Sequence, residues 1–295
     1  MIKARLGLMA GMWCAGLLAA QADNVRHRFV CIDNAKDARL IYVDPFTPSN
    51  SWTRPVSAAS RSLQRVDDSR ILVGFDTGFA EYALKGGDEL ARLAGYERIS
   101  SVARMPDGST WLAGHSPSGV VLHVVERDLR ARGAPRLVYP DASALRLLQV
   151  LENGHLLMAV NKPFRAVELD EAGRTVWSAA LEAYGDKGYE VSRLPDGTTL
   201  ASTGGGVKVV QVDCQGRLLH FWGEQKRGDH PEWGLDFVSG FDRLANGNIV
   251  VSNWLGHGKH GTGPHLVEFN ADNVPVWQWA DPAAARQVTH VLMIE

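Results

Sequence analysis

The sequence predicts an all-β fold, and three observations lead to this prediction. A hairpin turn recurs along the chain: apolar runs flank an Asp-Gly or Asn-Gly pair, with glycines at Gly108, Gly154, Gly197 and Gly247. Such pairs favour tight hairpins because Gly and Asn accept positive φ at low cost. A polar turn follows in each unit and marks a second hairpin. Self-similarity at a period of about 45 residues, without helical periodicity, indicates a β-propeller.

The second hairpins give the number of blades. They span residues 40–55, 79–93, 120–138, 165–178, 207–222 and 264–279, which predicts a six-bladed ring. Each blade then holds four strands, named a to d from the axis outwards, and the glycine turn joins strand a to strand b. A β-sandwich with a tail would not explain this regular repeat.

The two ends of the chain supply the missing parts of one blade. Residues 27–32 read as a strand b with no strand a before it, and residues 287–295 read as a strand a with nothing after it. We expect the C-terminal strand to complete the N-terminal blade, with Ile294 beside the strand that contains Val30. Such closure leaves no long sheet edge exposed.

Composition indicates one globular domain over residues 23–295. Of 295 residues, 45% are hydrophobic and 22% are charged, which allows a sizeable core. The formal net charge is −2 and no basic stripe is visible, which argues against a nucleic-acid partner. We expect a monomer.

The first 22 residues predict a signal peptide. Lys3 and Arg5 precede an apolar segment, and residues 20–22 offer a small-x-small cleavage pattern. The apolar segment is too short to be a convincing membrane span. We therefore expect an exported protein, periplasmic or secreted, that does not span the membrane once the leader is removed.

Two cysteines remain after the leader, Cys31 and Cys214. An oxidising compartment favours disulfides, but the predicted strands place Cys31 in blade 1 and Cys214 in a turn of the non-adjacent blade 5. A disulfide needs Cα atoms within about 7 Å. We therefore favour a buried, apolar role for Cys31 over a disulfide.

The two faces of the ring differ in their loops. The a–b and c–d turns lie on one face, the turn face, and are short and generic. The b–c loops and the d-to-a crossovers lie on the other, the loop face, and are longer and chemically richer, as functional loops tend to be. The rich segments are residues 115–119, 161–165, 184–190, 222–237 and 253–265.

The b–c loop of blade 6 is the most unusual segment, with three histidines and four glycines. One interpretation is a metal site on His257, His260 and His265, although a loop lacks the fixed geometry of the helical zinc motif. A second is ligand contact by His257 with Trp254 and Asn253, because His is a common polar contact in concave sites. A third is a flexible loop with exposed histidines.

The crossover from blade 5 to blade 6 is the second candidate. It holds two tryptophans and four carboxylates, among them Trp233, Glu232 and Asp236. Aromatic platforms beside carboxylates suit sugar recognition, because the rings stack and the acids bind hydroxyls. Asp236, or Glu190 in the preceding crossover, would serve as acid or base if desolvated. The alternative is that these charges are solvated.

Further candidates surround the axis at the loop face. Tyr189 and Glu190 enter strand a of blade 5, where the innermost strand lines the channel, and His290 enters the closing strand. Three cations of blade 4 offer positive charge to a carboxylate or sulfate group; they are Arg146, Lys162 and Arg165.

Through the blade repeats at residues 193–202 and 243–252, the chain resembles six-bladed NHL, SMP-30-like and PQQ-like propellers. These families include lactone hydrolases, lyases, sugar-acting enzymes and non-catalytic binding proteins. The resemblance implies the architecture and does not imply a bound PQQ. A calcium-dependent lactonase would bring acidic and Asn ligands onto the channel, and the residues available are Glu190, Asn161, Asn253 and Asp236.

Three functions follow from these features. The first is an exported propeller that binds a carbohydrate or another small polar ligand on its loop face. The second is a metal-assisted hydrolase or lyase that uses the same face, with zinc or calcium as cofactor. The third is a protein-interaction scaffold, which would need a broad apolar patch. Fold alone does not choose between them.

Overall fold

The computed structural model describes residues 25–140 and 145–295. The predicted signal peptide, residues 1–22, lies outside the described residues. Within the described part of the chain, no helix has the length and apolar character to cross a membrane.

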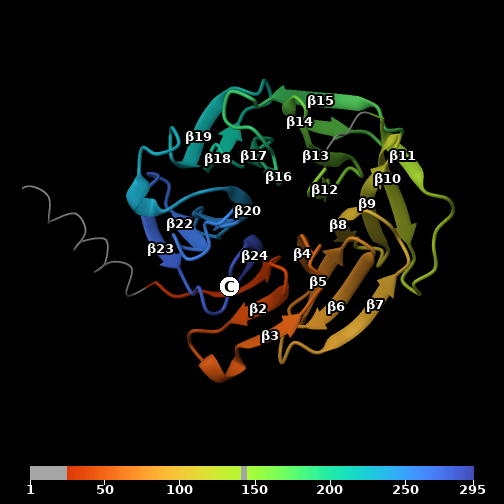
Figure 1. Cartoon of the computed structure of the whole chain (residues 1–295). Helices are drawn as coiled ribbons and strands as arrows, with labels where there is room; N and C mark the ends of the chain where they lie inside the picture. The colour runs from red at the N-terminus through yellow and green to blue at the C-terminus, as the bar shows by residue number, and fades with distance from the viewer. Residues whose placement is uncertain (1–24, 141–144) are drawn as a thin grey trace, which may run out of the picture.

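The protein is a six-bladed β-propeller, as the repeats predict (Figure 1). Each blade is an antiparallel four-stranded sheet, and its strand a lies nearest the axis. Blades 1 to 3 comprise β24 (Val288–Ile294), β1 (Arg28–Asp33), β2 (Arg39–Val43), β3 (Trp52–Pro55); β4 (Ser62–Arg65), β5 (Arg70–Phe75), β6 (Gly78–Ala83), β7 (Glu89–Ala94); and β8 (Ile99–Arg104), β9 (Thr110–Ser116), β10 (Gly119–Val125), β11 (Arg136–Tyr139).

Blades 4 to 6 repeat the same order of strands. They comprise β12 (Leu148–Val150), β13 (Leu156–Asn161), β14 (Phe164–Leu169), β15 (Thr175–Ala180); β16 (Val191–Arg193), β17 (Thr199–Ser202), β18 (Lys208–Val212), β19 (Leu218–Gly223); and β20 (Val238–Arg243), β21 (Ile249–Asn253), β22 (Leu266–Phe269), β23 (Pro275–Trp279). Two short 3-10 helices, η1 (Pro48–Asn50) and η2 (Pro231–Trp233), lie in connections.

The ring closes as predicted, with the last strand in the first blade. β24 pairs antiparallel with β1, so that Ile294 lies opposite Arg28 and Leu292 opposite Val30. The red and blue ends of the chain therefore meet in one sheet (Figure 1). This pairing satisfies backbone groups that a three-stranded first blade would leave open.

The core lies between neighbouring blades, where the faces of adjacent sheets pack together. One such cluster joins blades 6 and 1 and contains Phe29, Val250 and Val291, with Cys31 fully buried among them. Burial raises the pKa of the Cys31 thiol. Cys214 is exposed in the c–d turn of blade 5, and both cysteines are free. The preference for a buried Cys31 without a disulfide is thus confirmed.

The innermost strands are joined to one another by side chains. Strand a is the inner edge of each sheet, so its axis-facing N–H groups lack a strand partner and need another acceptor. Ser101 Oγ in blade 3 accepts from Leu148 N in blade 4, at 3.0 Å. Gln149 Oε1 in blade 4 accepts from Arg193 N in blade 5, at 2.7 Å. Each acceptor thereby ties its blade to the next one along the chain.

The same link recurs at the other boundaries and completes a circle. Between blades 2 and 3, Ser62 and Gln64 accept from the N–H groups of Val102 and Arg104. The other three boundaries use ionisable acceptors: Glu190 Oε2 to Phe241 N (2.9 Å), Asp242 Oδ2 to Met293 N (2.7 Å) and His290 Nδ1 to Leu63 N (3.1 Å). We call these linking side chains the cap ring.

Candidate functional site

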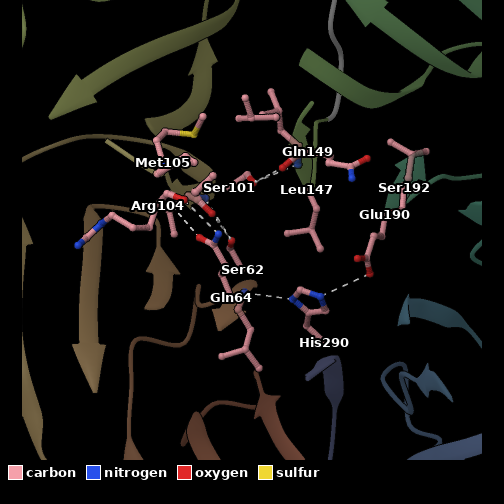
Figure 2. A pocket seen from close by; sticks show the side chains of 17 residues that line it. Ser62, Gln64, Ser101, Arg104, Met105, Leu147, Gln149, Glu190, Ser192 and His290 are labelled. Atoms are coloured by element: carbon pink, nitrogen blue, oxygen red, sulfur yellow. Dashed lines mark hydrogen bonds and ion pairs between the residues drawn. The ribbon is translucent and has the colours of Figure 1, made fainter. Parts of the chain in front are cut away.

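Two cavities lie at the two ends of the axial channel. The cavity toward the turn face has a volume of about 450 Å³ and is lined by strands a and by the Met105–Pro106 turn. Figure 2 shows that its polar walls are the cap-ring side chains, including Ser62, Gln64 and His290. Their acceptors already bind backbone N–H groups of the next blade. This cavity is therefore a consequence of how the blades are joined.

The cavity at the loop face has a volume of about 570 Å³. This lies within the usual range of small-molecule sites, roughly 300–1,000 Å³. Loops and crossovers of several blades and the first residues of inner strands form its wall. The lining residues are Asn34, Arg61, Arg146, Asn161, Lys162, Asp186, Lys187, Gly188, Tyr189, Phe237, Ser239, Trp254, His257 and Thr289.

One side of this cavity is aromatic. Trp254 Nε1 donates to Asn34 Oδ1 at 3.1 Å, which fixes the indole across the boundary between blades 6 and 1. The Phe237 ring packs edge-on against the indole, with 5.7 Å between ring centroids. The His257 ring does the same, with 4.8 Å between centroids. His257 is exposed and has φ 52°, in the left-handed region that non-glycine residues seldom adopt. The wall is held by hydrogen bonding and packing, with an imidazole at its rim.

Asn253 holds this wall in place. Its amide Nδ2 donates to the carbonyls of Gly234 (2.9 Å) and Pro264 (2.8 Å). Its Oδ1 accepts from the N–H groups of Asp236 (2.8 Å) and Phe237 (3.3 Å). Because a primary amide has two donors and two acceptor sites, nothing remains for a ligand. Asn253 was expected to contact the ligand, and the structure gives it a structural role instead, in which it joins the crossover to the b–c loop.

Asn161 joins the previous crossover to blade 4 in a similar way. Its Oδ1 accepts from Gly188 N at 2.7 Å, and its Nδ2 donates to Gly188 O at 3.1 Å. This pair of bonds places the segment that carries Lys187 and Tyr189 at the cavity. The residue therefore positions the wall, which is a different role from the calcium ligand that the sequence suggested.

The opposite side of the cavity is cationic. Four basic side chains, Arg61, Arg146, Lys162 and Lys187, line it together with one carboxylate, Asp186. Burial and the neighbouring Arg61 guanidinium lower the pKa of Arg146. Burial raises the pKa of Tyr189 to about 12, while the two arginines act in the opposite direction. The site is thus amphipathic, with an aromatic wall facing a positively charged one.

Several residues proposed from the sequence lie elsewhere. Trp233 stacks on His230 at 3.9 Å and packs edge-on against Phe269, outside the cavity lining. The Asp236 carboxylate forms an ion pair with Arg227. These two residues belong to the structure of the crossover, so the sugar site suggested for that segment is not assembled.

Three other candidates also fall outside the loop-face cavity. Glu190 and His290 belong to the cap ring and line the turn-face cavity, with 3.4 Å between Oε2 and Nε2 (Figure 2). Arg165 lies on β14 and does not contribute to the lining. Among the candidates read from the sequence, the loop-face cavity brings together Trp254, His257, Tyr189, Arg146, Lys162 and Asn161.

The three histidines proposed as metal ligands do not form a site. His265 is fully buried at the start of strand c, and its Nδ1 lies 3.4 Å from Asp281 N. His257 and His260 are exposed in the loop. Over residues 25–140 and 145–295, no three His, Cys, Asp or Glu side chains gather in a group that could hold a metal ion. The hypothesis of a three-histidine metal site fails because His265, next to strand c of blade 6, is buried in the core, away from the exposed His257 and His260.

Sequence reasoning missed the lining residues Asn34, Arg61, Ser239 and Thr289, and it did not single out Lys187 and Phe237 within the segments 184–190 and 222–237. Arg61 precedes strand a of blade 2 much as Arg146 precedes strand a of blade 4. A comparison of the residues just before each inner strand would have found this pair. Phe237, which precedes strand a of blade 6, would have been found by the same comparison.

Comparison with known proteins extends the fold assignment. No protein-family model and no curated protein sequence matches the chain. Among solved structures, a protein of unknown function from Bacteroides caccae is 20% identical, with 92% of this chain and 100% of that chain covered and a TM-score of 0.72.

Two more distant structures share the architecture. A chain of a nidogen/laminin complex is 8% identical, covers 92% of this chain and 99% of that chain, and gives a TM-score of 0.61. A catalytically inactive histidine-to-alanine variant of virginiamycin B lyase from Staphylococcus aureus, solved with quinupristin, is 9% identical. It covers 92% of this chain and 93% of that chain, with a TM-score of 0.57. Identities this low establish the propeller fold only.

Proposed function

We propose that the protein binds a small organic ligand in the loop-face cavity. The observation that carries this proposal is the indole of Trp254, which is fixed by Asn34 and Phe237 and forms part of the cavity wall. A fixed aromatic face opposite polar side chains is the usual composition of a small-molecule site. A carbohydrate with its apolar CH face on the indole and a ring-bearing organic acid both fit this description.

The positions of the two acidic candidates, Glu190 and Asp236, favour binding without catalysis. Glu190 accepts from Phe241 N within the cap ring, and Asp236 is paired with Arg227. Neither carboxylate lines the loop-face cavity. A general acid or base must reach the reacting group directly or through one water, so these two residues do not support a hydrolytic role there.

A lyase is the second candidate, because one observation favours it. His257 is exposed at the rim of the cavity, and the imidazole is the commonest general base in enzymes. A similar fold occurs in virginiamycin B lyase, whose histidine-to-alanine variant is catalytically inactive. In that case the protein would consume a cyclic ester or a related substrate, and His257→Ala would bind it without turnover.

The exposed large hydrophobic residues do not favour a scaffold. Those of the described chain lie on the outer strand d or in the c–d turn, with one or two in each of the six blades; they are Phe46, Leu90, Leu129, Leu137, Val176, Leu218, Leu219 and Val274. Isolated exposed apolar residues are normal for a soluble protein. An interaction surface would need a contiguous patch.

Export is also part of the proposal. It is supported by the leader-like composition of residues 1–22, with Lys3 and Arg5 before an apolar segment. Mass spectrometry of the protein from separated cell fractions tests it. A mature N-terminus near residue 23 in the exported fraction is expected, and an intact N-terminus confined to the cytosol would contradict export.

The binding proposal is tested with a panel of sugars, sugar acids, aromatic acids and their neutral analogues, screened by thermal shift and then calorimetry. Each hit is measured again with Trp254→Ala and with a control, Trp177→Ala. Trp177 lies on the outer strand of blade 4, and its indole donates to Cys214 O in the c–d turn of blade 5. We expect Trp254→Ala to lose at least about tenfold in affinity, or about 1.4 kcal/mol. Equal affinities for the two variants would contradict the proposal.

A further inference from the structure

The hydroxyl of Tyr189 is a buried polar group without a well-formed hydrogen bond. The residue is 6% exposed and lines the loop-face cavity, and no described residue bonds its hydroxyl in good geometry. The Thr289 side chain is close enough to lower the pKa of the phenol, although burial outweighs this effect. The neighbouring Thr289 hydroxyl donates instead to Ile32 O at 3.4 Å. Buried tyrosine hydroxyls normally find a hydrogen-bond partner, because leaving one unpaired costs about 1–3 kcal/mol. A ligand in the cavity would supply the missing acceptor.

Two arginines of the same cavity have no carboxylate partner among the described residues. Arg61 donates to Ala59 O at 3.2 Å, and Arg146 makes no hydrogen bond or ion pair with another described residue. By contrast, Arg104 and Arg193 in the neighbouring inner strands form ion pairs with buried carboxylates at 3.1 and 2.9 Å. Two guanidinium groups that repel each other at a half-buried site call for an anion.

The surroundings strengthen the positive field. Lys162 and Lys187 line the same cavity, and the Asp186 carboxylate accepts from Gly205 N at 2.9 Å. Burial lowers the pKa of His115, and the charges of Arg146 and Arg61 lower it further. His115 therefore adds little positive charge near neutral pH, and the positive field of the cavity comes from Arg61, Arg146, Lys162 and Lys187.

We propose that Arg61, Arg146 and the Tyr189 hydroxyl form a subsite for the carboxylate of a small organic acid, whose apolar ring lies against Trp254 and Phe237. The inference rests on the proposed binding function and names its ligand class. A carboxylate offers two oxygens with about four lone-pair sites, which suits two guanidinium donors and one phenol. A neutral sugar would leave both arginines without a counter-charge.

The size of the cavity and the placement of the aromatic wall set limits on the rest of the acid. A volume of about 570 Å³ accommodates a molecule with one or two rings and excludes a folded macromolecule. Trp254 reaches the cavity from blade 6, while Arg146 reaches it from the crossover into blade 4, on the other side of the axis. The carboxylate and the ring should therefore sit at opposite ends of the ligand.

Phenylacetate and its neutral isostere phenylacetamide test the subsite, measured by calorimetry at low ionic strength. The wild-type protein should bind the acid at least tenfold more tightly than the amide. Arg146→Gln and Arg61→Gln should each remove most of this preference, and Tyr189→Phe should reduce it severalfold while leaving amide binding unchanged. The matched control is Arg127→Gln, an exposed arginine of the turn face that forms no ion pair among the described residues.

The folding of the variants gives a second readout that needs no ligand. Because Arg61 and Arg146 repel each other, Arg146→Gln should melt at the same temperature as the wild type or higher. Saturating sodium sulfate should raise the melting temperature of the wild type more than that of Arg146→Gln at matched ionic strength. A lower melting temperature for Arg146→Gln, or an equal sulfate response, would count against the subsite.

The outcomes separate the subsite from the binding function itself. If the wild type binds phenylacetate no better than phenylacetamide, or if the preference survives in Arg146→Gln, the carboxylate subsite is wrong. If Trp254→Ala then still weakens binding of the amide, the cavity remains a ligand site of another class. If Trp254→Ala binds phenylacetate as tightly as the wild type, the anion subsite stands and the aromatic wall has no role in binding.

Discussion

The Nδ1 atom of His290 accepts a hydrogen bond from the backbone N–H of Leu63, 3.1 Å away, across the boundary between blades 1 and 2. This contact closes the cap ring, because His290 lies on the C-terminal strand that completes the first blade. An acceptor Nδ1 leaves the proton of the neutral imidazole on Nε2, which faces Glu190 at 3.4 Å. The chain end is thus joined to the second blade as well as to the first.

The cap ring predicts that removing the small Ser101 side chain lowers the stability of the protein. Ser101→Ala leaves Leu148 N without its acceptor in a buried setting. We expect a loss of about 1–3 kcal/mol in the free energy of unfolding, the usual cost of an unpaired buried donor. Chemical denaturation measures it, with Ser118→Ala in an exposed b–c loop as the control. Equal stability of the two variants would show that water replaces the Ser101 hydroxyl as the acceptor for Leu148 N.

The ionisable part of the ring predicts a pH dependence at Asp242. Burial, with the nearby Glu190 charge, raises the pKa of Asp242 from 3.8 to about 6. A carboxyl whose pKa is higher in the folded state stabilises that state at low pH. This contribution is lost as the pH rises from about 4 through about 6. A shift of this size corresponds to at most about 3 kcal/mol.

The variant Asp242→Asn isolates this effect. Asparagine keeps an oxygen acceptor for Met293 N but does not titrate. Unfolding free energies of both proteins, measured from pH 4 to pH 7, should show the wild type losing stability relative to the variant over this range. A constant difference would mean that Asp242 titrates normally in the folded protein.

The glycines of the blades predict two different kinds of cost. Gly197 has φ +84° in an Asp-Gly turn and open space around its Cβ position, so Gly197→Ala should cost only the strain of positive φ, about 1–2 kcal/mol. At Gly119, with φ +134°, an added Cβ would lie 2.1 Å from Tyr139 O. Gly119→Ala should therefore lower the melting temperature more than Gly197→Ala. The reverse order would contradict the register of β10 and β11.

His257 predicts a separation of binding from stability. The residue is exposed in its loop, so His257→Ala should change the free energy of unfolding by less than about 0.5 kcal/mol. Trp254→Ala should cost more, because the indole binds Asn34 and packs on Phe237. Both variants should weaken phenylacetate binding. Unchanged affinity in His257→Ala would mean that the imidazole makes no contact with the bound acid.

The fold was predictable because its signals are local. The turns at Gly108, Gly154, Gly197 and Gly247 have positive φ, as Asp-Gly and Asn-Gly hairpins require. The lone strands at the two ends had a single arrangement that left no open edge. The cap ring was not predictable, because it depends on the register of inner strands in different blades.

The position of the loop-face cavity was predictable, and its lining residues were less so. Loop length and chemistry identified the loop face, where the aromatic and cationic walls now lie. Asn253 was misread because three of its partners, Gly234, Asp236 and Phe237, come from a crossover whose path no pattern gives. His265 was misread because it precedes Leu266, and the strand draws both residues into the core.

Hydrogen–deuterium exchange with and without the tightest-binding member of the small-molecule panel tests the central claim most directly, since it compares the two ends of the channel in one experiment. Binding at the loop face predicts slower exchange in residues 186–189 and 254–258, with no change in the turns at residues 105–109 and 195–198. Protection confined to those turns would place the ligand in the turn-face cavity and would contradict the account.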